Sequence, residues 1–161
     1  GGLAEYARIG EVDKARELLQ VSERLGNLRL MINAQDKFGW TAMHWACEGD
    51  EEEMNERQKA KKLAIVKMLC TEYRGSLDMG VKTGRGNIAL SHAVWNGNVK
   101  AVQFLLRKKG SDVNAATEYG WTSLHWACNG RKDPDGVWHP LRDVLQVLLR
   151  RAYEAKVNAS S

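Results

Sequence analysis

Short apolar runs recur along the chain, each bounded by glycine or by a cluster of polar residues. The longer runs, such as AIVKMLC (64–70) and DVLQVLL (143–149), place large aliphatic residues at a spacing that suits one face of a helix. Each is preceded by a shorter segment with small residues at its centre, such as TAMHWAC (41–47) and TSLHWAC (122–128). The pattern predicts an all-α chain built from pairs of one short and one longer helix.

Two of the shorter segments belong to nearly the same phrase, GWTAMHWACEG (39–49) and GWTSLHWACNG (120–130). In both, a threonine stands directly before the apolar segment, where its hydroxyl can cap a helix N-terminus. A third unit, GNIALSHAVWNGNVKAVQFLLRKKGSDVNA (86–115), lies between them, and a partial unit, LAEYARIGEVDKARELL (3–19), precedes them. Gly10 and Gly97 are expected to end the short helices of these two units. One helix pair cannot bury its apolar face alone, so the units are expected to stack as repeats.

The stretch GSDVNAATEYGWTSLHWA (110–127) resembles the consensus of ankyrin repeats, and the resemblance extends over almost the whole chain as roughly four repeats. It implies a solenoid of antiparallel helix pairs with short β-hairpin fingers, whose concave surface is lined by the short helices and the fingers. The expected units are a partial repeat at 1–34, repeats at 35–80 and 81–115, and a last repeat at 116–161 that ends with the start of a further finger. The third unit departs from the family pattern at Ile88 and Ser91, so its short helix is expected to be less well capped.

Two of these units are expanded between their helices. Residues 50–62 (DEEEMNERQKAKK) open with Asp50 and Glu53, which spell a capping box, and contain no glycine or proline. The second helix of that unit is therefore expected to start early and to project as a charged extension, either solvated or docking a partner. Residues 131–140 (RKDPDGVWHP) carry a turn signal and are expected to form a loop, with Trp138 packed against the solenoid rather than left for a partner.

Composition restricts the setting only weakly. The chain is 43% hydrophobic and 27% charged, with a formal net charge of +4, which permits an acidic partner without requiring one. Cys47, Cys70 and Cys128 form no CxxC pair, which favours free thiols in a reducing, intracellular setting, cytoplasmic or nuclear. No apolar run is long enough for insertion across a membrane. The opening Gly1-Gly2 and the ending EAKVNASS (154–161), which is expected to lead into another finger, indicate a fragment of a longer protein, expected to be monomeric.

The candidate catalytic and metal-binding groups are explained by the repeat pattern. His44 with Cys47, and His125 with Cys128, share a helix face and resemble zinc-ligand pairs, but the ankyrin pattern uses these positions for capping and packing. No third group is evident to orient either pair for nucleophilic catalysis. The segment GVKTGRGN (80–87) lacks the strand–turn–helix setting of a phosphate loop, and the basic residues are scattered rather than gathered in a stripe. The sequence therefore predicts no enzyme, no cofactor or metal site and no small-molecule substrate, and it disfavours nucleic acid as a partner.

The tryptophans are the most informative residues. By family geometry Trp40 and Trp121, beside the finger glycines, and Trp45 and Trp126, on the short helices, should line or border the concave side. Large rigid aromatic surfaces of this kind serve as binding hot spots, although packing between repeats is the competing interpretation. The leading function is a protein–protein interaction module that binds a protein or peptide. The expected partner-binding residues are Lys37, Phe38, Trp40, Trp45, Glu48, Arg85, Trp95, Glu118, Tyr119, Trp121, Trp126 and Asn129.

The first copy of the phrase is also similar to the cage-bearing repeat in the ankyrin domains of certain histone lysine methyltransferases, where two tryptophans and a glutamate hold methylated lysine. The corresponding residues here are Trp40, Trp45 and Glu48, with His92 at the position of a further aromatic and Trp95 one turn beyond it. The attraction in such a cage is cation–π, supplemented by one carboxylate. A methyl-lysine or cationic-peptide reader is therefore one alternative function, and a regulatory array within a larger enzyme or channel is another.

Overall fold

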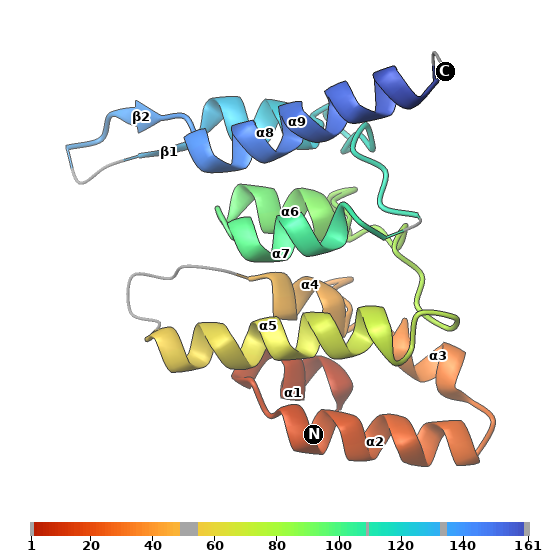
Figure 1. The fold of residues 1–161 in the computed structure, drawn as a ribbon. Coiled ribbons are helices and arrows are strands. Elements are labelled where there is room, and N and C mark those ends of the chain that lie inside the picture. The colour runs from red at the N-terminus through yellow and green to blue at the C-terminus, as the bar shows by residue number, and fades with distance from the viewer. Residues whose placement is uncertain (1, 49–54, 109, 133–134, 160–161) are drawn as a thin grey trace.

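The helices form a stack of two-helix layers (Figure 1). The structure is a computed structural model that describes residues 2–48, 55–108, 110–132 and 135–159. Along the chain the elements are α1 (Leu3–Ile9), α2 (Val12–Arg24), α3 (Leu28–Ile32), α4 (Ala42–Cys47), α5 (Glu56–Thr71), α6 (Ala89–Trp95), α7 (Val99–Leu105), α8 (Ser123–Asn129), β1 (Arg131–Lys132), β2 (Trp138–His139) and α9 (Arg142–Ala159). Each short inner helix (α1, α4, α6, α8) pairs with a following outer helix (α2, α5, α7, α9), as the sequence predicts.

The layers are close together because the inner helices carry alanine where they face one another. Ala46, Ala93 and Ala127 occupy the same position of α4, α6 and α8, and each is fully buried. Outer helices contribute large aliphatic side chains such as Leu69 and Leu105 to the same core, both with 0% exposure. Small residues let the inner helices approach, and large residues fill the space behind them, which gives the density of a packed protein interior.

Threonine and histidine together start two of the inner helices. Thr41 is the N-cap of α4, and its backbone N–H donates to His44 Nδ1 at 3.3 Å. Thr122 and His125 repeat this arrangement at α8, where the backbone N–H to Nδ1 distance is 3.1 Å. These are the predicted caps. The N-cap of α6 is Ile88, which has no side-chain cap, and this confirms the weaker start expected for the third unit.

The fingers between layers are closed by tight turns that stack on one another. The backbone N–H of Thr83 donates to the carbonyl of Asn87, and the N–H of Thr117 to the carbonyl of Trp121. Gly86 completes the first of these turns with φ +78°, and a Cβ added there would lie 2.9 Å from the backbone nitrogen of Glu118 in the next finger. Glycine therefore serves two purposes at this position: it adopts a left-handed conformation and lets neighbouring fingers touch.

Because Gly86 lies so close to the next finger, replacing it should cost more stability than replacing Gly120, which has a similar φ. Gly120 has φ +76°, but a Cβ there would meet nothing within 4 Å. Gly120→Ala is expected to lose roughly 1 kcal/mol of unfolding free energy from left-handed strain alone. Gly86→Ala should lose about 1–2 kcal/mol more, because its Cβ would push two fingers apart. Urea denaturation of both variants measures the difference, and equal losses would contradict the contact.

The charged insertion of the second unit differs from the prediction at both ends. The expected cap at Asp50 and Glu53 lies outside the described residues. Helix α5 itself starts early, but at Glu56, with Asn55 accepting from the backbone N–H of Gln58 at 2.9 Å in a capping box. The start of this extension, residues 55–58, is exposed as expected, but Lys62 at its other end is buried and only 4% exposed.

Two predictions for the last unit were wrong. Residues 157–159 (VNA) do not lead into a finger, because α9 continues through them to Ala159. No glycine or proline interrupts the chain after Pro140, so nothing in the sequence ends that helix. Trp138 does not pack against the solenoid either. It lies in the β1–β2 hairpin, which projects beyond α8, and it is 50% exposed beneath the Lys132 ammonium at 5.4 Å from the ring centroid.

Candidate binding groove

A continuous row of rings crosses the inner side of three layers. Its members, in spatial order, are Trp45, Trp40, His92, Trp95, Trp126 and Trp121, and we call them the aromatic row. Neighbouring ring centroids are 4.5, 4.3, 6.2, 5.6 and 4.6 Å apart in that order. Distances of this size are those of interacting aromatic pairs, so the rings form one surface rather than separate patches.

The repeated phrase explains both ends of this row. In each copy one tryptophan precedes the N-cap threonine and the other lies on the inner helix, four residues after that threonine. The resulting pairs are nearly superposable: Trp40 and Trp45 are tilted by 46°, and Trp121 and Trp126 by 48°. The layer between them contributes His92 and Trp95 from α6, and these two rings join the pairs into one row.

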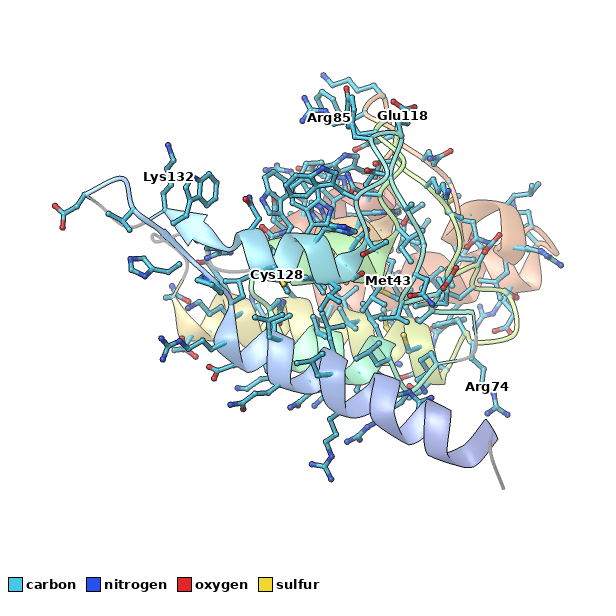
Figure 2. All side chains as sticks on the ribbon, turned by 90° about the horizontal axis from the view of Figure 1, so that it is seen from above. Met43, Arg74, Arg85, Glu118, Cys128 and Lys132 are labelled. Carbon is cyan, nitrogen blue, oxygen red and sulfur yellow. The ribbon has the colours of Figure 1, made fainter. Side chains whose placement is uncertain are left out.

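A groove of about 680 Å³ lies over the row and beneath the fingers. Finger residues form one wall, among them Phe38 and Tyr119, which are 58% and 79% exposed. Arg85 lines the groove from the finger between them. Figure 2 shows Arg85 together with Glu118 at the finger tips, on the opposite side of the molecule from α9. The groove is thus bounded by rings below and by charged and aromatic finger tips at one edge.

Asp36 holds the first tryptophan pair in place through hydrogen bonds. Its Oδ2 accepts from Trp45 Nε1 at 2.8 Å, and its Oδ1 accepts from the backbone N–H groups of Phe38 and Trp40 at 2.8 and 3.0 Å. Burial alone would raise the pKa of Asp36, but these hydrogen bonds outweigh it and hold the pKa below its usual value. The Asp36 carboxylate is therefore ionised, both of its oxygens accept hydrogen bonds, and it sets the orientation of Trp45.

Two charges are paired at the edge of the groove. Lys62 Nζ donates to Glu48 Oε2 at 3.1 Å, and the two side chains are 5% and 19% exposed. Glu48 lines the aromatic groove, so the carboxylate that the sequence offers to a cationic ligand is already neutralised by Lys62. This partner could not be predicted from the sequence, because Lys62 lies in the charged segment expected to be solvated or to dock a partner.

Two buried histidines contribute to the site: His92 is part of the row, and His44 lies beside it at 6.2 Å between ring centroids. His44 Nδ1 lies 2.9 Å from Thr41 Oγ1, and His44 Nε2 lies 3.1 Å from the carbonyl oxygen of Asn87. Burial lowers the pKa of His44, although the Asn87 carbonyl and Asp36 oppose the shift. Burial also lowers the pKa of His92, to about 3, helped by the nearby His44 and Lys62. Both imidazoles are therefore neutral at physiological pH, and neither serves as a charged ligand.

Comparison with known proteins agrees with this geometry. The family model described as ankyrin repeats matches residues 58–160 in three copies. The chain belongs to the ankyrin-repeat family. It is similar to a putative ankyrin repeat protein from Rickettsia bellii (strain RML369-C), with 39% identity over 62 residues, which cover 35% of this chain and 34% of that protein. The chain thus matches about a third of the length of this curated relative. Ankyrin repeats are in general protein–protein interaction modules.

Most of the residues expected to bind a partner lie around the ankyrin groove. Those that line it are Phe38, Trp40, Trp45, Glu48, Arg85, Trp95, Tyr119 and Trp126. Four others do not line it. Lys37 lies over the Phe38 ring at 5.0 Å, Trp121 packs on Trp126, Glu118 is exposed at a finger tip, and Asn129 ends α8 half-buried.

Sequence reasoning did not include two residues that shape this site. Asp36 orients Trp45, and Thr117 accepts from the backbone N–H of Trp121. A spacing signal existed for both, because each is a polar finger residue that lies nine residues before the ring on its inner helix. His92, which the sequence places at the position of a further aromatic, packs against Trp40 in the row. Within the described residues no helix is long and apolar enough to cross a membrane, and no group of three or more potential metal ligands is gathered.

Proposed function

We propose that this ankyrin array is a non-catalytic interaction module that binds an extended segment of a partner protein along the aromatic row. The observation that carries the proposal is the continuity of six rings across three layers beneath a groove of about 680 Å³. Rigid aromatic surfaces bind with little loss of side-chain entropy, which is why tryptophan dominates binding hot spots.

The nucleophiles near the core support a binding role rather than catalysis. Burial raises the pKa of the Cys47 thiol far above its ordinary value and raises that of Cys70 to about 11. A thiol that stays protonated is a poor nucleophile. His44 has both ring nitrogens within hydrogen-bond distance of its cap and of a neighbouring carbonyl, so it is not available as a base.

A selected peptide tests the proposal. Random peptides displayed on phage are panned against the chain, and the enriched peptide is synthesised and titrated by calorimetry. Trp40→Ala and Trp126→Ala are each expected to weaken its binding about 30-fold, as for hot-spot residues. Trp138→Ala is the matched control, since that tryptophan is exposed on the hairpin and does not line the groove. Loss of binding with Trp138→Ala alone would place recognition on the hairpin and contradict the proposal.

A narrower candidate function is recognition of a methylated lysine or another cationic side chain. The observation in its favour is that Trp40, Trp45, Trp95 and Glu48 all line one groove, with ring faces that attract cations. The pairing of Glu48 with Lys62 counts against it, because a cation would have to compete for that carboxylate. Two peptides that differ only in trimethylation of one lysine test this candidate function. A methyl-lysine reader binds the methylated peptide alone, and Trp40→Ala abolishes that binding.

A further inference from the structure

The three fingers use one polar side chain for the same purpose. Asp36, Thr83 and Thr117 each accept a hydrogen bond from the backbone N–H four residues further on, at 3.0, 3.2 and 3.2 Å. In each layer a ring of the aromatic row follows nine residues after the finger residue. The rings are Trp45, His92 and Trp126, respectively.

The fingers differ in whether their polar side chain also accepts a hydrogen bond from the N–H of that ring. The aspartate has a second oxygen, which accepts from Trp45 Nε1 at 2.8 Å. The hydroxyl oxygens of Thr83 and Thr117 accept from the backbone, and neither accepts from the ring of its own layer. His92 Nε2 and Trp126 Nε1 have no hydrogen-bond partner. They are two of only four such buried side-chain atoms among the described residues.

Both unpaired nitrogens belong to side chains that line the groove. His92 is 3% exposed, and a buried polar atom without a partner is costly, so natural structures nearly always satisfy it. The indole N–H can only donate, and the neutral imidazole of His92 donates in the tautomer that carries its proton on Nε2. These two donors on α6 and α8 therefore lack acceptors, which a ligand in the groove can supply.

The spacing of the two donors restricts the ligand. They lie on the neighbouring inner helices α6 and α8, and because the axes of packed helices are about 8–10 Å apart, we take the two donors to be separated by about that distance. Trp95 lies between them, 6.2 Å from His92 and 5.6 Å from Trp126. A polyproline II segment repeats every three residues with a rise of about 3.1 Å per residue, so carbonyls i and i+3 point the same way about 9 Å apart. In a β-strand residues i and i+3 face opposite sides.

We propose that the groove binds a proline-rich segment in the polyproline II conformation. Its carbonyls i and i+3 accept hydrogen bonds from His92 Nε2 and Trp126 Nε1, and its pyrrolidine rings pack on Trp95 and the tryptophans beside it. Both nitrogens are buried in the unliganded chain, so binding requires the side chains that cover them to shift. Aromatic grooves suit such segments because the ligand is already ordered before it binds. This inference rests on the proposed function and specifies its partner.

Dodecaproline is the probe, and a glycine–serine peptide of the same length is its control. Dodecaproline is uncharged when its ends are blocked, and it offers carbonyl acceptors without N–H donors. Titration is followed by the indole ¹H–¹⁵N resonances, with the Trp126 signal assigned by Trp126→Phe. We expect dodecaproline to shift the Trp126 resonance and the glycine–serine peptide to leave it in place.

Two substitutions at Thr117 distinguish loss of the ligand's hydrogen bond to Trp126 Nε1 from a general loss of stability. Thr117→Asp copies the Asp36 arrangement, so it should satisfy Trp126 Nε1 internally, raise the midpoint of thermal unfolding and weaken dodecaproline binding about tenfold. Thr117→Val removes the acceptor for the Trp121 N–H but leaves Trp126 Nε1 unpaired. It should therefore lower the unfolding midpoint and bind dodecaproline more tightly than Thr117→Asp does.

Opposite results overturn the inference. It fails if Thr117→Asp binds dodecaproline as tightly as the parent, or if the glycine–serine peptide binds equally well. If phage-selected peptides bind in a manner that depends on Trp40 but dodecaproline does not bind, the inference falls and the proposed function stands. If no selected peptide depends on the tryptophans of the row, both fall.

Discussion

Replacing Glu48 with alanine is expected to lower the free energy of unfolding by about 3–5 kcal/mol, because it leaves the Lys62 ammonium buried without its partner. Lys62 is 5% exposed at its side chain and donates to Glu48 Oε2 at 3.1 Å, so removal of the carboxylate leaves a largely buried ammonium without its ion-pair partner. Urea denaturation at pH 7 measures the effect, and an unchanged slope against urea would show that the folded state remains compact.

Two controls make this prediction specific to a buried charge. Glu5 pairs with Arg8 at 2.8 Å on the surface, with side chains 48% and 46% exposed, so Glu5→Ala should cost far less unfolding free energy than Glu48→Ala. The double variant Glu48→Leu with Lys62→Met removes both charges and should regain most of the loss. A loss with Glu48→Ala no larger than with Glu5→Ala would mean that Lys62 reaches water in the folded chain.

The local features of the fold could be predicted from the sequence because short-range chemistry decides them. Thr41 and Thr122 cap inner helices whichever layer they belong to, and Gly10 and Gly97 end helices through their own left-handed backbone. The twin phrase likewise placed two tryptophans per copy on the inner side, since each pair is set by positions within one repeat.

Features that depend on contact between layers or distant segments could not be predicted in this way. Lys62 belongs to a charged segment, and only the arrangement of α5 against α4 shows that it is buried beside Glu48. The aromatic row likewise depends on His92 meeting Trp40 from the neighbouring layer at 4.3 Å. Trp138 illustrates the reverse case, because an apolar side chain was expected to be covered but lies on a projecting hairpin that the core does not reach.

Acidification from pH 6.5 to 5 is expected to remove roughly 2 kcal/mol of stability through His92 alone, at about 1.4 kcal/mol per pH unit. Burial, with the nearby His44 and Lys62, lowers the pKa of His92 in the folded chain from 6.5 to about 3. Below pH 6.5 the unfolded chain takes up a proton that the folded chain does not, so stability falls as the pH falls until the folded pKa is reached. The lowered pKa of His44 acts in the same direction.

His92→Phe tests this assignment because it keeps a ring in the row but cannot titrate. Urea midpoints at pH 7, 6 and 5 should fall steeply for the parent and much less for the variant, which retains only the contribution of His44 among the two buried histidines. The window ends at pH 5 because the lowered pKa of Asp36 makes that carboxylate contribute only at more acidic values. Parallel slopes for parent and variant would mean that His92 is solvated in the folded chain. A buried, neutral His92 can donate a hydrogen bond to a bound carbonyl without adding charge to the groove, so peptide binding should be far less sensitive to this pH range than stability.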